Sequence, residues 1–107
     1  MNRLACTEYV ADLDAVCNLD LPWNDLKGKT VVVSGATGMI GAFFIDVLMR
    51  KNETAELGCN IFALGRSIEK ARLRLPYFES CHFSFEEASV SSAGYRPTCS
   101  ADFVLHL

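Results

Sequence analysis

The chain has 107 residues, half of them hydrophobic, and a formal net charge of −3. This length allows at most one small domain, and the slight excess of acidic residues argues against nucleic acid as the main partner. Glycine, aspartate and arginine interrupt the apolar runs well before the ~20 residues that a membrane span requires, and no signal-peptide core follows the N-terminus, so we expect a cytoplasmic protein that does not enter a membrane.

Residues 3–18 predict an amphipathic helix. Its apolar side chains share one face at helical spacing, namely Tyr9, Leu13, Val16 and Cys17. The helix precedes the first strand, and the proline-containing stretch Leu21–Asp25 ends it, so residues 1–26 form an N-terminal helical extension and linker. We expect the helix to pack on the body of the domain; contact with a second subunit is the alternative.

The stretch from Val31 to Gly41 carries the strongest signal in the chain. A β-branched run meets three glycines and an amphipathic segment begins at once, which is typical of a strand, a tight turn and a helix whose N-terminus receives a phosphate group. Gly35 allows a sharp turn, and Gly38 allows a pyrophosphate to approach the backbone. At Gly41, a side chain would push the helix off the neighbouring strand. The alternative is an ordinary strand-to-helix turn without a ligand.

The helix after this turn has apolar residues at helical spacing, which we assign to the core: Ile40, Phe43, Phe44, Val47 and Leu48. The same spacing places Asp46, Arg50 and Lys51 on the opposite, polar face. The helix is therefore expected to pack on the sheet by one face only.

Three further strands are predicted after the first strand, at residues 60–64, 82–86 and 101–107. Ser67 is expected to cap a helix over residues 68–75. Three basic side chains make the outer face of that helix positive, and we expect them to be solvated: Lys70, Arg72 and Arg74. The strands predict an α/β fold with a parallel sheet in the order 3-2-1-4.

The end of the second predicted strand bears on the choice of cofactor, because in dinucleotide-binding folds this residue meets the adenosine ribose. An acidic residue there would accept a hydrogen bond from the 2′-hydroxyl and favour NAD. This chain has Gly65-Arg66-Ser67 instead, and Arg66 is suited to pair with a 2′-phosphate. We expect NAD or NADP, with NADP favoured; alternatively, Arg66 stacks on the adenine and tolerates either cofactor.

The Gly35–Gly41 turn, with the sequence Gly-Ala-Thr-Gly-Met-Ile-Gly, resembles the cofactor turn of the extended short-chain dehydrogenase/reductases. More narrowly, it is similar to that of the NAD-dependent epimerase/dehydratase family, which modifies nucleotide sugars. The stretches Leu21–Trp23, Lys27–Thr30 and Asp46–Met49 support the likeness, as does the His-Leu that ends the last predicted strand.

The resemblance implies that residues 27–107 are the N-terminal half of a Rossmann-type NAD(P)-binding domain. It also implies which residues contact the dinucleotide: Gly35, Thr37, Gly38, Met39, Ile40 and Gly41 in the turn, Arg66 and Ser67 after the second strand, and Leu107 at the end of the fourth. In the family, an Asp followed by a branched apolar residue comes after the third strand and contacts the adenine; the nearest match in this chain is Ser89-Val90. In the full-length family, a nucleotide sugar is the second ligand.

The chemistry of the family needs a Tyr and a Lys four residues apart, which exchange a proton while hydride moves to or from the nicotinamide. Tyr9, Tyr77 and Tyr95 are each followed four residues later by Leu or Cys, so we assign no catalytic residue to this chain. The five cysteines form no C-x-x-C pair and indicate free thiols rather than a metal site. A parallel sheet that stops at its fourth strand has an apolar edge, so we expect marginal stability or self-association through that edge.

These observations leave three functions open. The first is the dinucleotide-binding portion of an NAD(P)-dependent nucleotide-sugar epimerase or dehydratase, truncated before its catalytic residues and its sugar-binding part. The second is a non-catalytic NAD(P)-binding, redox-sensing module, with which the stretch Ala63–Arg66 is equally consistent. The third is an inactive truncated gene product.

Overall fold

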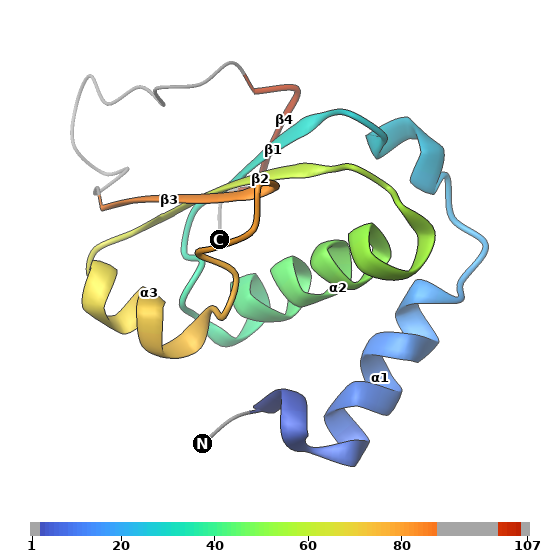
Figure 1. Cartoon of the computed structure of the whole chain (residues 1–107), viewed down its shortest axis with the longest axis horizontal. Coiled ribbons are helices and arrows are strands. Elements are labelled where there is room, and N and C mark those ends of the chain that lie inside the picture. The colour runs from blue at the N-terminus through green and yellow to red at the C-terminus, as the bar shows by residue number, and fades with distance from the viewer. Residues whose placement is uncertain (1–2, 88–100, 106–107) are drawn as a thin grey trace.

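The computed structural model describes residues 3–87 and 101–105. Their centre is a sheet of four strands in the order β3-β2-β1-β4, namely β1 (Thr30–Val33), β2 (Asn60–Gly65), β3 (Phe83–Glu87) and β4 (Phe103–Leu105) (Figure 1). The three neighbouring pairs are all parallel. The predicted α/β fold and strand order are therefore confirmed. The strand ends differ from the predicted ones by one or two residues, apart from the C-terminal end of the fourth strand, where residues 106 and 107 lie outside the described part of the chain.

Two helices, α2 (Met39–Ala55) and α3 (Ile68–Arg74), lie on one face of the sheet (Figure 1). Side chains of a strand alternate between its two faces. Those that point toward the helices form the main core with Ala42, Ile45 and Leu48 of α2: Val31, Val33, Ile61, Ala63 and Phe83. The intervening residues form a second buried cluster on the other face of the sheet: Val32, Phe62 and Leu64.

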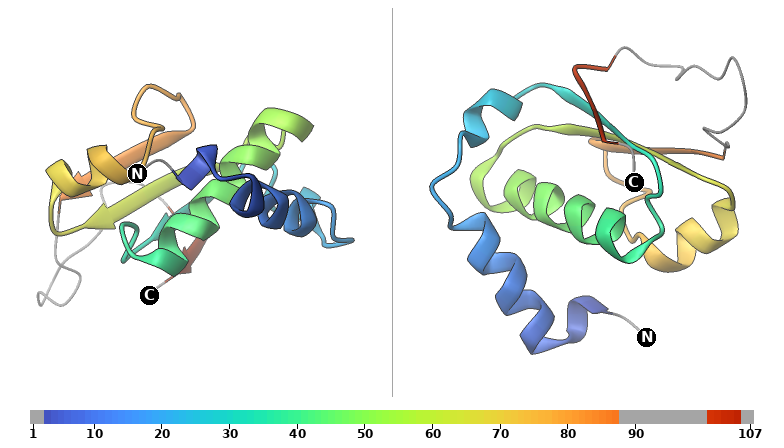
Figure 2. Two further views of the ribbon diagram at one scale, coloured as in Figure 1. Left: turned by 90° about the horizontal axis from the view of Figure 1, so that it is seen from below. Right: turned by 180° about the vertical axis from the view of Figure 1, so that it is seen from behind.

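The N-terminal extension is an addition that packs on α2 (Figure 2). The expected single helix is divided into a short 3₁₀ helix, η1 (Arg3–Ala5), and an α-helix, α1 (Thr7–Cys17), because Cys6 between them is extended. Leu13 and Cys17 pack against Val47, and the Tyr9 and Phe43 rings meet edge to face with centroids 5.8 Å apart. Packing on the body of the domain is thus confirmed. None of the described helices is long and apolar enough to cross a membrane.

A second 3₁₀ helix, η2 (Trp23–Leu26), connects α1 to β1. Trp23 packs against both the main core and the cluster of α1 on α2, and its Nε1 donates a hydrogen bond to the Leu19 carbonyl at 3.0 Å. Lys51 lies over the Trp23 ring, with Nζ 4.8 Å from its centroid. The connection is therefore anchored to the body of the domain.

Two predictions about α2 are wrong. Ile40 is assigned to the core by its spacing, but it is 70% exposed, because it lies in the first turn of the helix at the open end of the glycine turn. The helical spacing places Asp46 on the polar, solvated face, whereas in the structure Asp46 is only 1% exposed. The N-terminal extension and the turn after α3 cover this carboxylate and supply hydrogen-bond donors from Arg3, Tyr9 and Tyr77. A buried carboxylate is tolerated because these groups replace the water that it loses.

Candidate functional site

The glycine turn lies at the carboxyl end of the central strand. The chain first passes from β1 to β2 and β3 on one side, and then crosses to β4 on the other side of β1. The turn after β1 therefore occupies the point where the strand order reverses, which is where open α/β sheets bind their ligands. The Ala36 N–H donates to the Leu64 carbonyl at 3.3 Å and fixes the turn to β2.

The first turn of α2 has a geometry that suits an anion. Gly38 is the N-cap residue, with φ −74° and ψ 168°, and the Ala42 N–H donates to its carbonyl at 2.9 Å. The N–H groups at the start of a helix have no partner within the helix, and they carry the positive end of its dipole. Met39 and Ile40 are 86% and 70% exposed, so the start of the helix is open to a ligand.

Each of the three glycines acts differently in this turn. Gly35 has a positive φ of 66°, as a sharp turn after the strand requires. A Cβ on Gly41 would lie 2.3 Å from the Gly35 carbonyl oxygen, so the expected clash with a neighbouring strand is corrected to a clash with the turn itself. A Cβ on Gly38 would meet the same oxygen at 3.3 Å, which is tight even without a ligand.

The end of β2 lies against the glycine turn. A Cβ on Gly65 would be 3.1 Å from the Phe85 ring and 3.9 Å from the methyl group of Thr37. Arg66 follows and is exposed. The Ser67 hydroxyl accepts a hydrogen bond from the Lys70 N–H at 3.2 Å, which confirms the predicted helix cap. The structure thus brings the turn, Arg66 and Ser67 to one edge of the sheet.

The structure does not test two of the predicted contacts. Leu107 and the Ser89-Val90 pair lie outside the described residues. The fourth strand is described as far as Leu105, whose carbonyl accepts a hydrogen bond from the Ser34 N–H at 3.0 Å.

Arg74 belongs to this site, although the sequence pattern placed it among the solvated basic residues of α3. Its Nη1 donates to the Thr37 carbonyl at 2.8 Å, so a guanidinium stands at the glycine turn. A helix of seven residues is only about 10 Å long, which lets an arginine at its end reach back to the turn. The sequence holds no signal for this contact, because it depends on how α3 lies on the sheet.

Glu87 is the second residue that the sequence pattern did not single out. It ends β3, and its Oε2 accepts a hydrogen bond from the Ile68 N–H at 2.8 Å, at the N-terminus of α3. A carboxylate is favourable there because it complements the helix dipole. The edge of the sheet therefore carries two arginines and one carboxylate around the ends of β1, β2 and β3.

The sheet order and the glycine turn define a Rossmann-like α/β domain. No protein-family model matches the chain, and no solved structure matches it. The chain is similar to the aldehyde reductase lnbA from Aspergillus flavus, with 33% identity over 73 residues, or 67% of this chain. The chain spans about 7% of the length of that relative.

Proposed function

We propose that this chain binds NAD or NADP and is the dinucleotide-binding portion of an NAD(P)-dependent oxidoreductase. The observation that carries the proposal is the Gly35–Gly41 turn, which joins the central strand to the open N-terminus of α2 at the reversal of strand order. The pyrophosphate would lie over the N–H groups of Met39, Ile40 and Gly41. The similarity to a reductase supports the redox class, in which the bound nicotinamide supplies hydride transfer.

Two arginines favour NADP over NAD in this proposal. Arg66 is exposed at the end of β2, and Arg74 is held at Thr37, beside the same strand end. A 2′-phosphate would pair with guanidinium groups in this position. Glu87 supports the alternative, since a carboxylate near the ribose suits the 2′-hydroxyl of NAD and repels a 2′-phosphate.

For the substrate, the finer proposal is a nucleotide-sugar epimerase or dehydratase, supported by the sequence of the turn and of the flanking stretches. The second candidate is a reductase of aldehydes, which the similarity to lnbA favours. A non-catalytic dinucleotide sensor is the third. The reading frame in the gene separates the two enzymes from the sensor: a downstream Tyr-x-x-x-Lys supports an enzyme, whereas an intact frame without this motif supports the sensor.

The test is a titration of the purified chain with NADPH and NADH, followed by nicotinamide fluorescence and by thermal shift. We expect saturable binding, tighter for NADPH. Gly38→Val should abolish it, because the added side chain occupies the space of the pyrophosphate. Ala55→Val is the matched control, since it adds a branched side chain at the exposed far end of the same helix. Equal binding by the two variants would exclude the proposed site.

A further inference from the structure

We propose that Arg3 is a positioning residue for the dinucleotide site, because it joins the buried Asp46 carboxylate to the end of α3 and so holds the Arg74 guanidinium at the glycine turn. The inference rests on the proposed dinucleotide binding and adds to it a role for the N-terminal extension. Through this contact, the extension sets the affinity of the site for phosphate groups.

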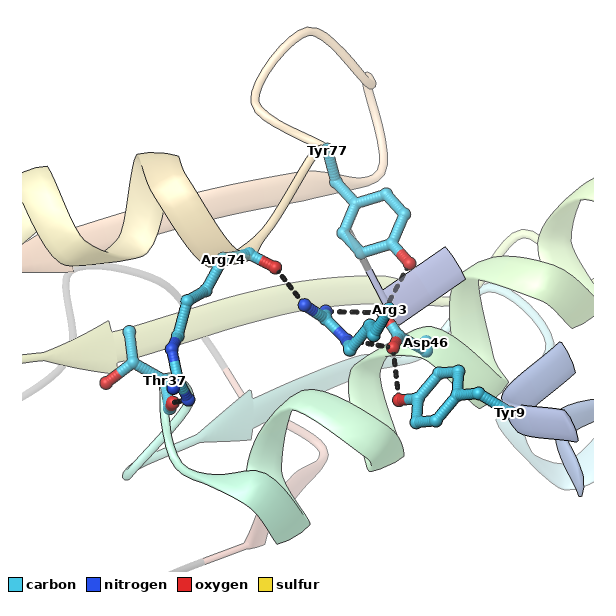
Figure 3. A network of polar contacts seen from close by, with 6 residues as sticks. All are labelled: Arg3, Tyr9, Thr37, Asp46, Arg74 and Tyr77. Atoms are coloured by element: carbon cyan, nitrogen blue, oxygen red, sulfur yellow. Dashed lines mark hydrogen bonds and ion pairs between the residues drawn. The ribbon is translucent and has the colours of Figure 1, made fainter. Parts of the chain in front are cut away.

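The first step is the complete hydrogen bonding of Asp46 (Figure 3). Its Oδ2 accepts from Arg3 Nε at 2.7 Å and from the Tyr9 hydroxyl at 2.6 Å. Its Oδ1 accepts from Arg3 Nη2 at 3.0 Å and from the Tyr77 hydroxyl. A carboxylate has about four acceptor positions, and here all four are used. The Arg3 guanidinium is thus fixed in a bidentate pair with a buried partner.

The second step is the remaining donor of the same guanidinium. Arg3 Nη1 donates to the main-chain carbonyl of Arg74, the last residue of α3. The final carbonyls of a helix have no partner within the helix, and a cation there also complements the dipole. One planar side chain therefore connects α2 to α3. A lysine would do this less well, because its ammonium group is a single point charge on a flexible stem.

The third step links α3 to the glycine turn. With its carbonyl held by Arg3, Arg74 extends its own side chain to the Thr37 carbonyl at 2.8 Å. Arg74 is exposed, and an exposed arginine loses rotamer entropy when it is held in one geometry. Because the main chain is already fixed, only this side-chain entropy is lost when Arg74 contacts Thr37. Two contacts, Arg3 to Arg74 and Arg74 to Thr37, thus lead from the extension to the phosphate site.

The experiment uses Arg3→Lys in the whole chain. Lysine keeps a positive charge for Asp46, so the fold is retained, but it lacks the planar fork that reaches α3. We expect NADPH affinity to fall by about 2- to 30-fold, the usual range for a change that acts through packed neighbours, and NADH affinity to fall less. Asp14→Asn is the matched control: it breaks a second ion pair of the extension, with Arg50, without touching α3.

A double-mutant cycle separates positioning from a general structural effect. Because Arg3 acts through Arg74, Arg3→Lys should cause no further loss of NADPH affinity in an Arg74→Ala background. Additive losses, or an unchanged affinity in Arg3→Lys, would overturn the inference. So would an equal fall in the Asp14→Asn control.

A second measurement does not depend on the ligand. The order of the Arg74 side chain, followed by its Nε–H signal in NMR, should fall in Arg3→Lys and stay unchanged in Asp14→Asn. An ordered Arg74 in Arg3→Lys would refute the positioning role. If the unaltered chain binds neither dinucleotide, the proposed function is wrong, and this signal still decides whether Arg3 orders Arg74.

Discussion

At the residue scale, Gly38 and Gly41 exclude a side chain for different reasons. Gly41 is buried in the first turn of α2, and its missing Cβ makes room for the Gly35 carbonyl. Gly38 is exposed, and a Cβ there would meet the same oxygen at 3.3 Å, a milder contact than that of Gly41. One glycine is therefore required by the fold, and the other chiefly by the proposed function.

We expect Gly41→Ala to lower the free energy of unfolding by about 1–3 kcal/mol or more, because a Cβ 2.3 Å from a carbonyl oxygen forces the turn to move. Gly38→Ala, with a contact of 3.3 Å, should cost less stability while weakening dinucleotide binding. Urea denaturation of both variants measures the difference. Equal stabilities would show that the turn adapts freely and would contradict the assignment.

Arg66 is the residue that tests cofactor choice most directly. Arg66→Asp should weaken NADPH binding more than NADH binding, because it replaces a partner of the 2′-phosphate with a like charge. Lys70→Asp is the control, since it makes the same change of charge at another exposed position, on α3. Equal losses for the two dinucleotides in Arg66→Asp would mean that the arginine only stacks on the adenine.

At the scale of elements, two phenols besides Arg3 join their segments to Asp46 of α2: Tyr9 of the N-terminal extension and Tyr77 of the turn after α3. Burial, and then the hydrogen bond to Asp46, raise the pKa of Tyr9 from 10.0 to about 12. The same causes raise the pKa of Tyr77 still further. In the folded state these hydroxyls must stay protonated, because each donates a hydrogen bond to the Asp46 carboxylate.

This arrangement predicts a loss of stability at alkaline pH. The unfolded chain releases the Tyr9 proton near pH 10 and the folded chain near pH 12, so the contribution is complete below pH 10 and declines as the pH rises toward 12. Burial raises the pKa of Cys59 from 9.0 to about 11, which adds a decline that begins near pH 9. Urea denaturation at pH 8 and pH 11 measures the combined loss of unfolding free energy. Tyr9→Phe should reduce the pH dependence; an unchanged slope would contradict the assignment.

At the scale of the whole molecule, one side of the sheet exposes apolar surface. The strand β4 lies at the edge, and its Phe103 and Val104 are 46% and 67% exposed. A groove of about 560 Å³ runs between α2 and the Leu21–Leu26 segment as far as Phe103. Because an edge strand presents main-chain hydrogen-bonding groups to solvent, this side is suited to pairing with another chain.

We therefore expect the isolated chain to self-associate or to bind a hydrophobic dye such as ANS, and Val104→Lys to reduce both effects. Leu73→Lys is the matched control: Leu73 is 88% exposed, but it lies on α3, which packs on β3 at the other end of the sheet. Sedimentation and dye fluorescence provide the measurement. A monodisperse monomer that binds no dye would contradict this expectation.

The sequence alone predicts the fold and the turn, because the signals involved are local. Strand and helix periods, the three glycines and the Ser67 cap each depend on a few adjacent residues, and right-handed crossovers leave few ways to arrange the strands. The roles of Met39, Ile40 and Arg66 at the site follow from the same local motif. They stay predictions until dinucleotide binding is measured.

Only the tertiary structure determines the surroundings of Asp46 and Arg74, which the local sequence pattern predicts incorrectly. Helical spacing alone places Asp46 in solvent, but Arg3, which is 43 positions away in the chain, covers it. Arg74 belongs to a basic helix face by sequence, yet it meets Thr37 across 37 positions. Such contacts depend on how the helices pack on the sheet, and a short stretch of sequence carries no information about that packing. The strands, the helices and the glycine turn were therefore determined by the sequence, whereas the polar network behind the turn was decided only by packing.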